Sequence, residues 1–232
     1  MEFKFKQFSI YHQDNVFKFG TDAALLATWV DMSKSKNVLE IGTGTGVITL
    51  MMAQRNPNGS YLGIDISKTA IELASKNLHK FPIDAEIKFK HSAIQAFSFE
   101  GKFDLIVSNP PFFEDSTKSP SELKNTTRHT DTLPLRDLLS YSKDLLTPNG
   151  SINIIYPIRY LNNINSICNE MGLFPNHITT LRSTSQKAIK RVLISITCCP
   201  CSPITSELII NGNHKGYSNQ VYNMLAPFLL NL

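Results

Sequence analysis

The sequence lacks any continuous apolar run that approaches the length of a membrane span. The first residues, which include Glu2, Lys4 and Lys6, also lack the hydrophobic region of a signal peptide. We therefore expect a cytoplasmic protein without membrane contacts. Because 42% of the 232 residues are hydrophobic, the chain has enough apolar side chains to bury a full core as one domain.

Cysteine is scarce, and its spacing does not suit a metal site. Cys168 stands alone, while Cys198, Cys199 and Cys201 lie in or directly after an apolar, strand-like run. A zinc site would need ligands with better spacing. We expect reduced, partly buried thiols and no bound metal.

The complete glycine pattern of dinucleotide-binding proteins is also missing. An apolar strand at 38–41 runs into Gly42, Gly44 and Gly46, after which a helix begins. Glycine allows the backbone to approach a ligand closely at such a turn. The spacing is G-x-G-x-G, and Val47 occupies the third glycine position of the dinucleotide motif G-x-G-x-x-G. The pattern therefore disfavours a nicotinamide enzyme.

Two acidic residues accompany the glycine turn. Glu40, at the end of the first strand, is poorly suited to a pyrophosphate but well suited to the ammonium group of a methionine moiety. Asp65 ends the next strand, nineteen positions after Gly46, where an acid can accept both ribose hydroxyls. Together these residues predict a pocket for S-adenosylmethionine. The alternative is a glycine turn that only packs a helix, with a solvated Asp65.

The tetrapeptide Asn109-Pro110-Pro111-Phe112 is the most informative motif. It follows an apolar run at 103–107 that is typical of a buried parallel strand, so it should lie where α/β sheets bind ligands. The two prolines fix two φ angles and remove two backbone donors. We expect a stiff turn with free carbonyl groups, although an ordinary proline turn before a helix is the alternative.

Such a turn suits a planar amine or amide whose nitrogen must become a nucleophile. The Asn109 side-chain oxygen and the Pro110 carbonyl are both able to point at one group that carries N–H bonds. For an adenine N6 amine, two such acceptors favour a pyramidal nitrogen whose lone pair faces an electrophile. Phe112 adds a flat face beside the base.

The chain resembles the class I S-adenosylmethionine-dependent methyltransferases, and among them the Asn-Pro-Pro-aromatic amino methyltransferases. It is most similar to the bacterial tRNA adenine-N6 methyltransferases that modify the adenine immediately 3′ of the anticodon in a valine tRNA. The resemblance rests on the glycine turn and on residues 3–8, 18–22, 109–112 and 128–131, which span most of the first 140 residues. The later part matches only in general character.

The resemblance assigns roles residue by residue. Thr21 and Asp22 would close over the methionine end of the cofactor, which Asn109 would also contact. The remaining cofactor-binding residues would be Glu40, Gly42, Gly44, Gly46 and Asp65. The catalytic residues would be Asn109, Pro110 and Phe112, with Pro111 and Phe113 binding the substrate.

One position departs from the pattern of these relatives. Many of them place an acid after the third strand to accept the adenine amine of the cofactor, whereas this chain has Ala93 there. We expect Ser92 or a backbone group to take its place.

The net charge of +4 permits an RNA partner without requiring one. Basic residues fall into three groups: Lys4, Lys6 and Lys18; Lys118, Lys124, Arg128 and His129; and Lys187, Lys190 and Arg191. If these groups converge at the catalytic edge, they form a surface that follows phosphates. For any single lysine, a solvated exterior is the simpler interpretation. We expect the RNA to contact Arg128, His129, Lys187, Lys190 and Arg191.

Alternating patterns predict an α/β fold, a Rossmann-like seven-stranded sheet with helices on both faces. The expected strands are 37–41, 60–64, 86–90, 103–108, 151–156, 177–182 and 191–198, and the expected helices are 22–31, 46–55, 67–80, 134–146 and 160–171. Residues 3–11 should form a strand or hairpin over the cofactor mouth, 114–130 a lid that grips the substrate, and 218–232 a helix. The single domain, 1–232, would comprise an extension at 1–20, a core at 21–200 and a tail at 201–232.

The sequence therefore predicts a monomeric enzyme that transfers a methyl group from S-adenosylmethionine to the N6 amine of an adenine in tRNA. A protein glutamine N5-methyltransferase is one alternative, because an amide nitrogen poses the same lone-pair problem. Those acting on release factors carry a helical domain before the cofactor loop, and here only about forty residues precede it. DNA adenine methylation is less favoured, since no target-recognition insert is visible. A non-catalytic RNA-binding protein is disfavoured by the intact glycine turn, Asp65 and Asn109.

Overall fold

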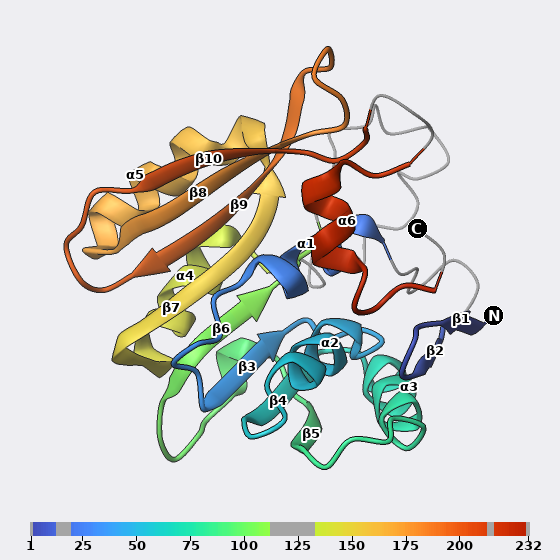
Figure 1. Cartoon of the computed structure of the whole chain (residues 1–232). Helices are drawn as coiled ribbons and strands as arrows, with labels where there is room; N and C mark the ends of the chain where they lie inside the picture. The colour runs from blue at the N-terminus through green and yellow to red at the C-terminus, as the bar shows by residue number, and fades with distance from the viewer. Residues whose placement is uncertain (1, 13–19, 112–132, 213–215, 231–232) are drawn as a thin grey trace, which may run out of the picture.

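A computed structural model describes residues 2–12, 20–111, 133–212 and 216–230 (Figure 1). An eight-stranded sheet forms its centre, in the order β10-β8-β9-β7-β6-β3-β4-β5. These strands are β3 (Asn37–Ile41), β4 (Ser60–Asp65), β5 (Glu86–His91), β6 (Phe103–Ser108), β7 (Leu146–Pro157), β8 (Phe174–Arg182), β9 (Ile189–Thr197) and β10 (Ile204–Ile209). The helices are α1 (Thr21–Trp29), α2 (Val47–Arg55), α3 (Lys68–Leu78), α4 (Leu135–Leu145), α5 (Leu161–Met171) and α6 (Asn219–Leu225), with short 3₁₀ turns η1 (Ile94–Ala96) and η4 (Ile158–Tyr160).

The predicted Rossmann-like sheet is confirmed, with one correction to the number of strands. The strands β5, β4, β3, β6 and β7 are parallel, and β9 runs antiparallel between β7 and β8. The sheet has eight strands rather than the seven expected, because β10 pairs with β8 from Ile204↔His177 to Ile209↔Arg182. This edge strand is largely exposed, so it lacks the apolar alternation that marks the other strands, and it carries the sheet beyond residue 200.

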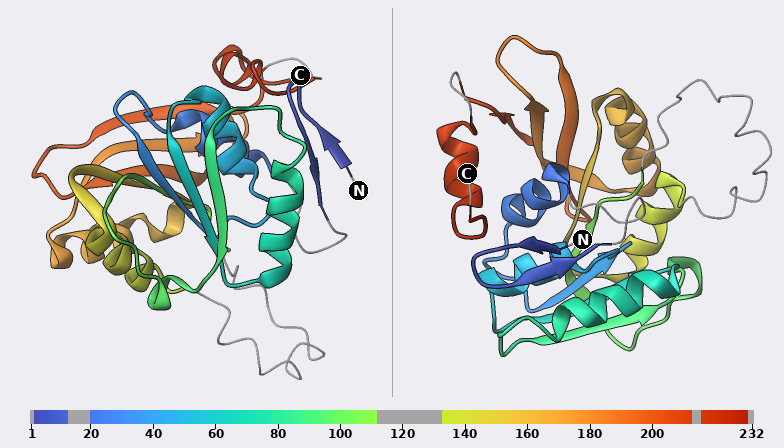
Figure 2. Two further views of the ribbon diagram at one scale, coloured as in Figure 1. Left: turned by 90° about the horizontal axis from the view of Figure 1, so that it is seen from below. Right: turned by 90° about the vertical axis from the view of Figure 1, so that its right-hand side faces the viewer.

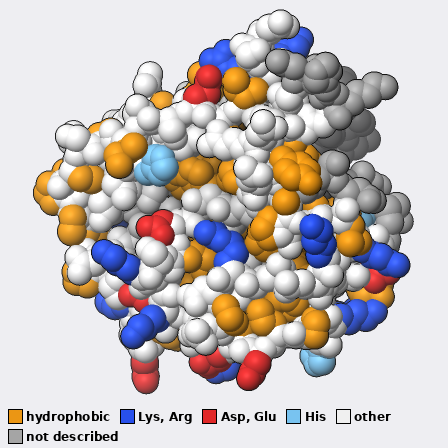
Figure 3. All heavy atoms as spheres, in the orientation of Figure 1, with side chains coloured by type: hydrophobic (Ala, Val, Ile, Leu, Met, Phe, Trp, Pro, Cys, Tyr) orange, Lys and Arg blue, Asp and Glu red, His pale blue; other side chains and the backbone are white. Residues whose placement is uncertain are grey.

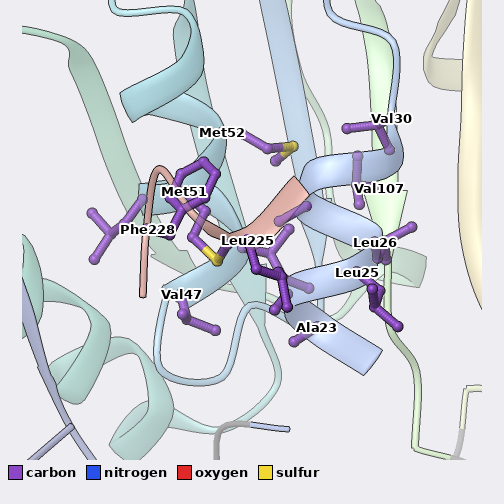
Figure 4. Packing of buried hydrophobic residues seen from close by; sticks show 14 of the residues in the cluster. Ala23, Leu25, Leu26, Val30, Val47, Met51, Met52, Val107, Leu225 and Phe228 are labelled. Carbon is purple, nitrogen blue, oxygen red and sulfur yellow. The ribbon is translucent and has the colours of Figure 1, made fainter. Parts of the chain in front are cut away.

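The two faces of the sheet bury separate apolar clusters. Successive side chains of a strand point to opposite faces, so Leu105 and Val107 of β6 join one cluster while Ile106 joins the other. The first cluster lies under α1, α2 and α6, whose side chains interdigitate in Figure 4. The second lies under α4 and α5, on the opposite side of the sheet (Figure 2). Burial on both faces explains the continuous apolar runs of the central strands.

The two ends of the described chain meet beside α2 and α3. An antiparallel hairpin, β1 (Glu2–Lys4) with β2 (Ser9–Tyr11), confirms the expected N-terminal extension. Phe5 forms a bridge with Leu229, and the Lys6 N–H donates to the Phe228 carbonyl at 2.7 Å. In the C-terminal tail the helix ends at Leu225, earlier than expected. None of the helices in the described ranges is long and apolar enough to cross a membrane.

Candidate active site

The carboxyl ends of β3, β4 and β6 meet at one edge of the sheet. Ile41 of β3 pairs with Ser108 of β6 on one side and with Ile64 of β4 on the other. Gly42 and Asn109 therefore directly follow two residues that are paired in the sheet. The chain adds β4 and β5 on one side of β3 and then returns with β6 on the other. Such a reversal of strand order is where open α/β sheets bind their ligands. The structure therefore brings the glycine loop and the Asn-Pro-Pro turn together.

The glycine loop, residues 42–46, adopts a backbone that requires glycine. Gly42, Gly44 and Gly46 have φ angles of 76°, 53° and 79°, in the left-handed region. A Cβ atom on Gly46 would lie 2.8 Å from the Phe89 ring, whereas one on Gly42 would meet nothing within 4 Å. The loop is thus tightly packed where α2 begins and open beside Gly42. An open cradle of backbone groups next to an acid fits S-adenosylmethionine.

Glu40 holds this loop in place through buried hydrogen bonds. Its side chain is 1% exposed, and its Oε2 atom accepts hydrogen bonds from the Thr43 hydroxyl (2.7 Å), the Thr49 N–H (3.0 Å) and the Thr49 hydroxyl (2.5 Å). Burial raises the pKa of Glu40 to about 7, and the hydrogen bonds from Thr49 and Thr43 offset only part of this effect. Glu40 therefore fastens β3 to the loop and to the first turn of α2. Its expected contact with a methionine ammonium group stays a prediction.

Asp65 lies against the middle of the glycine loop. Its Oδ2 atom accepts a hydrogen bond from the Gly44 N–H at 2.9 Å, and its Oδ1 atom accepts one from the Ser67 N–H at 2.8 Å. Ser67 in turn caps α3 by accepting from the Ala70 N–H at 3.3 Å. The carboxylate is therefore held against the glycine loop by hydrogen bonds. Its role as a ribose ligand stays a prediction.

Ser92 is next to Asp65, as its predicted role requires. Its N–H donates to the Asp65 carbonyl at 3.0 Å, and its hydroxyl donates to the Ala93 carbonyl at 3.0 Å. The hydroxyl oxygen keeps acceptor capacity, which an adenine amine needs. The adenine contact itself stays a prediction.

The Asn-Pro-Pro turn is tied to the end of β3. The buried Ser108 hydroxyl donates to the Ile41 carbonyl at 2.8 Å, which fixes the point where β6 ends. Asn109 is half-buried, Pro110 buried and Pro111 exposed. Phe112, Phe113, Arg128, His129 and the expected lid at 114–130 lie outside the described residues, so these assignments stay predictions.

Two residues with separately predicted roles are paired. Arg191 donates through Nε to the Asp22 Oδ2 atom at 3.1 Å, and the two side chains are 26% and 31% exposed. Arg191 pairs in the sheet with Pro157 at the end of β7, so it lies at the same edge as Asn109. Asp22 was assigned to the cofactor and Arg191 to the RNA, yet the structure joins them. Thr21, Lys187 and Lys190 are exposed.

Sequence reasoning missed Asn77, which connects the N-terminal hairpin to the glycine loop. Its fully buried side chain accepts from the Tyr11 N–H (2.8 Å) and donates to the carbonyls of Tyr11 (3.2 Å) and Thr45 (2.9 Å). The signal was a polar residue on the apolar stripe of α3, in register with Ala70, Leu73 and Ala74.

Sequence reasoning also missed an aromatic group at the end of β7, the strand next to β6. The rings of Tyr156 and Tyr160 meet edge to face at 5.4 Å, and the Arg159 guanidinium lies 5.0 Å from the Tyr160 ring centre. Partial burial raises the pKa of Tyr156. They lie at the carboxyl end of β7, which pairs with β6 on the side away from β3.

The cysteines form no disulfide. Cys168 is buried, which raises the pKa of its thiol to about 11, while Cys199 and Cys201 are exposed. Across the ranges that the structure describes, no group of three or more His, Cys, Asp or Glu side chains is arranged to hold a metal ion.

Comparison with known proteins assigns the chain to a family. Residues 7–162 match the family model of the methyltransferase small domain. The chain is 36% identical over 230 residues to the tRNA1(Val) (adenine(37)-N6)-methyltransferase of Phocaeicola vulgatus, covering 99% of this chain and 98% of the relative. It is 33% identical over 233 residues to the protein of the same name from Bacteroides fragilis, with the same coverage.

Solved structures agree on the fold. A predicted O-methyltransferase from Agrobacterium tumefaciens matches with a TM-score of 0.72 at 16% identity, over 89% of this chain and 96% of that one. A methyltransferase from Pyrococcus furiosus matches with a TM-score of 0.60 at 18% identity, over 83% and 90%. The family model and the two relatives show that the chain belongs to the methyltransferase small domain family, and the solved structures agree with the class I methyltransferase fold.

Proposed function

We propose that the protein transfers the methyl group of S-adenosylmethionine to the N6 amine of adenine 37 in a valine tRNA. The observation that carries this proposal is the position of Asn109, which follows β6 directly beside the glycine loop of β3. The relatives named for this reaction match over nearly the whole chain, which supports the choice of substrate.

Each part of the site then has a chemical task. Gly42–Gly46 and Asp65 bind S-adenosylmethionine, which when bound supplies an electrophilic methyl group. The Asn109 side-chain oxygen and the Pro110 carbonyl accept hydrogen bonds from the two N6 hydrogens. These bonds direct the nitrogen lone pair toward the methyl group. Because orientation does most of this work, the site needs no strong base, and the proton released from N6 passes to water.

The target base must leave its stack to reach Asn109. Bases in an anticodon loop are already partly unpaired, so extrusion costs less than flipping a base out of a duplex. We assign Phe112 and Phe113 to stacking and packing around that base, and Arg128, His129, Lys187 and Lys190 to the RNA backbone. A cytoplasmic location, a monomeric state and the absence of a metal remain part of the proposal.

Labelled S-adenosylmethionine tests the substrate. The protein is incubated with a valine tRNA transcript, with the same transcript carrying guanine in place of adenine 37, with duplex DNA and with a release factor. We expect label in the first transcript alone, as N6-methyladenine by mass spectrometry. Equal labelling of both transcripts would refute the target position. Labelled glutamine in the release factor, without labelled RNA, would transfer the assignment to the protein glutamine N5-methyltransferases.

A further inference from the structure

Two lysines, Lys76 of α3 and Lys80 just after its end, converge on one tyrosine of the N-terminal hairpin. The Nζ atoms of Lys76 and Lys80 lie 4.8 Å and 4.2 Å from the centre of the Tyr11 ring, and Lys80 also donates a hydrogen bond to the Tyr11 hydroxyl. The two lysines are four residues apart in the sequence, and both are exposed. One ring at the protein surface is therefore in contact with two ammonium groups.

This arrangement concentrates positive charge. Both ammonium groups lie close to the same ring and repel each other, so the pair is unfavourable unless something compensates it. Within the described ranges neither lysine forms a salt bridge, and Glu2 is the acid that acts on Lys80. The hydrogen bond with the Tyr11 hydroxyl raises the pKa of Lys80. The aromatic ring compensates the two cations only in part, and an anion would complete the site.

The position of Tyr11 is fixed from inside the protein. Asn77 binds both backbone groups of Tyr11, and the neighbouring Ile10 is fully buried. The Phe8 ring stacks on Phe5 at 4.4 Å and meets Phe81 edge to face at 4.9 Å. The surface is therefore built on a rigid support.

The same support places the surface beside the cofactor loop. Asn77 also donates to the Thr45 carbonyl, within the glycine loop. Lys4 is exposed on the hairpin strand β1, and Figure 3 shows Lys and Arg side chains gathered at the lower right, over the hairpin and α3. Lys187, in the turn between β8 and β9, and Lys190, at the start of β9, lie on the side of β6 away from β3. Basic residues thus flank the active site on two sides.

We propose that Tyr11, Lys76 and Lys80 form a phosphate-binding surface that holds the backbone of the RNA substrate on the cofactor side of the active site. This inference rests on the proposed tRNA methyltransferase function. Phosphate groups would neutralise the paired ammonium groups and release counterions, without reading the base sequence. A tRNA held here and at Lys187 and Lys190 would present its anticodon loop between the two surfaces, at Asn109.

The double variant Lys76→Gln/Lys80→Gln tests the surface. Binding of a valine tRNA transcript is measured by fluorescence anisotropy over a series of salt concentrations, and S-adenosylmethionine binding by calorimetry. We expect tRNA affinity at low salt to fall about tenfold and the slope of log affinity against log salt to become shallower by roughly one to two. S-adenosylmethionine affinity should stay that of the parent.

A matched control is Lys34→Gln/Lys36→Gln, which removes the same charge from two exposed lysines in the loop before β3, at the opposite edge of the sheet. It should change the salt slope far less. Tyr11→Phe, which keeps the ring and loses the hydroxyl contact with Lys80, should retain most of the affinity. Thermal melting of all variants checks that the hairpin stays folded.

Two results would overturn the inference. One is a salt slope for Lys76→Gln/Lys80→Gln equal to that of the control. The other is a loss of S-adenosylmethionine affinity as large as the loss of tRNA affinity. In both cases a parent protein that still methylates the transcript leaves the proposed function intact. A parent protein that methylates no RNA refutes the proposed function itself.

Discussion

The two halves of the sheet edge are built differently. On the cofactor side, the side chains of Glu40, Asp65 and Asn77 are hydrogen-bonded to the glycine loop, so the loop has its shape before a ligand binds. On the other side of Asn109, Lys187 lies in the turn before β9 and Lys190 at the start of that strand, and both are exposed. A small cofactor gains affinity from a preformed cradle, because less order is lost on binding. A long, charged RNA is attracted by exposed charge at less constrained positions.

The largest effect should come from replacing Asn109, the residue at which the cofactor side and the RNA side of the site meet. Asn109→Ala should lower turnover by about 10²–10³-fold, because it removes an acceptor that orients the target amine. It should leave S-adenosylmethionine binding nearly unchanged. Asp65→Ala should instead weaken that binding, since the carboxylate lies against the Gly44 N–H.

Calorimetry and single-turnover methylation on both variants measure this division. The assignment of roles would be wrong if Asn109→Ala lost the cofactor as severely as Asp65→Ala.

A second prediction concerns the rigidity of the cofactor side. Gly46→Ala should lower the free energy of unfolding by roughly 1–3 kcal/mol and weaken cofactor binding, because the new Cβ meets the Phe89 ring at 2.8 Å in a left-handed backbone. Gly172→Ala is the matched control, with a φ of 63° but nothing within 4 Å of the new Cβ. It should cost about 1 kcal/mol and leave cofactor binding intact.

Denaturant titration and calorimetry compare the two variants. Equal cofactor affinity in both would show that the loop tolerates distortion, and the contrast between the two halves would lose its basis.

These residues also show what the sequence alone could predict. The glycine loop, Asp65 and Asn109 were predictable, because each is a local pattern at the end of an apolar strand. The Arg191–Asp22 ion pair joins residues that are 169 positions apart, and no local pattern indicates it. Strand β10 was missed because an exposed edge strand buries little and needs no apolar alternation. Asn77 was visible only as a polar residue on an apolar stripe, since its partners come from distant segments.

A third prediction uses the buried acid. Because the pKa of Glu40 is raised from 4.5 to about 7, the folded protein binds this proton more tightly than the unfolded chain does. The free energy of unfolding should therefore fall as the pH rises from about 4.5 to 7, by at most roughly 3 kcal/mol. Glu40→Gln keeps an oxygen acceptor for Thr43 and Thr49 and removes this dependence.

The measurement is denaturant unfolding of both proteins between pH 5 and pH 8. We expect the difference between the parent and Glu40→Gln to grow toward pH 8 in favour of the variant. Parallel curves would mean that the pKa of Glu40 is the same in the folded and unfolded protein, and that burial does not disfavour its ionised form.

The smallest effect should come from dividing one basic cluster between the two sides. The cluster consists of Lys187, Lys190 and Arg191, which are close together in the chain. Among these three described residues, only Arg191 forms an ion pair, with Asp22 of α1. Lys187→Gln/Lys190→Gln should make the salt dependence of tRNA binding shallower and leave S-adenosylmethionine affinity unchanged.

Arg191→Gln should instead weaken S-adenosylmethionine binding a few-fold, because it frees Asp22 at the start of the helix predicted to close over the cofactor. Asp22→Asn, which removes the other partner of the ion pair, should reproduce that loss. Calorimetry and salt-dependent anisotropy on the three variants decide between these outcomes, and a shallower salt slope for Arg191→Gln with full cofactor affinity would return Arg191 to the RNA-binding side.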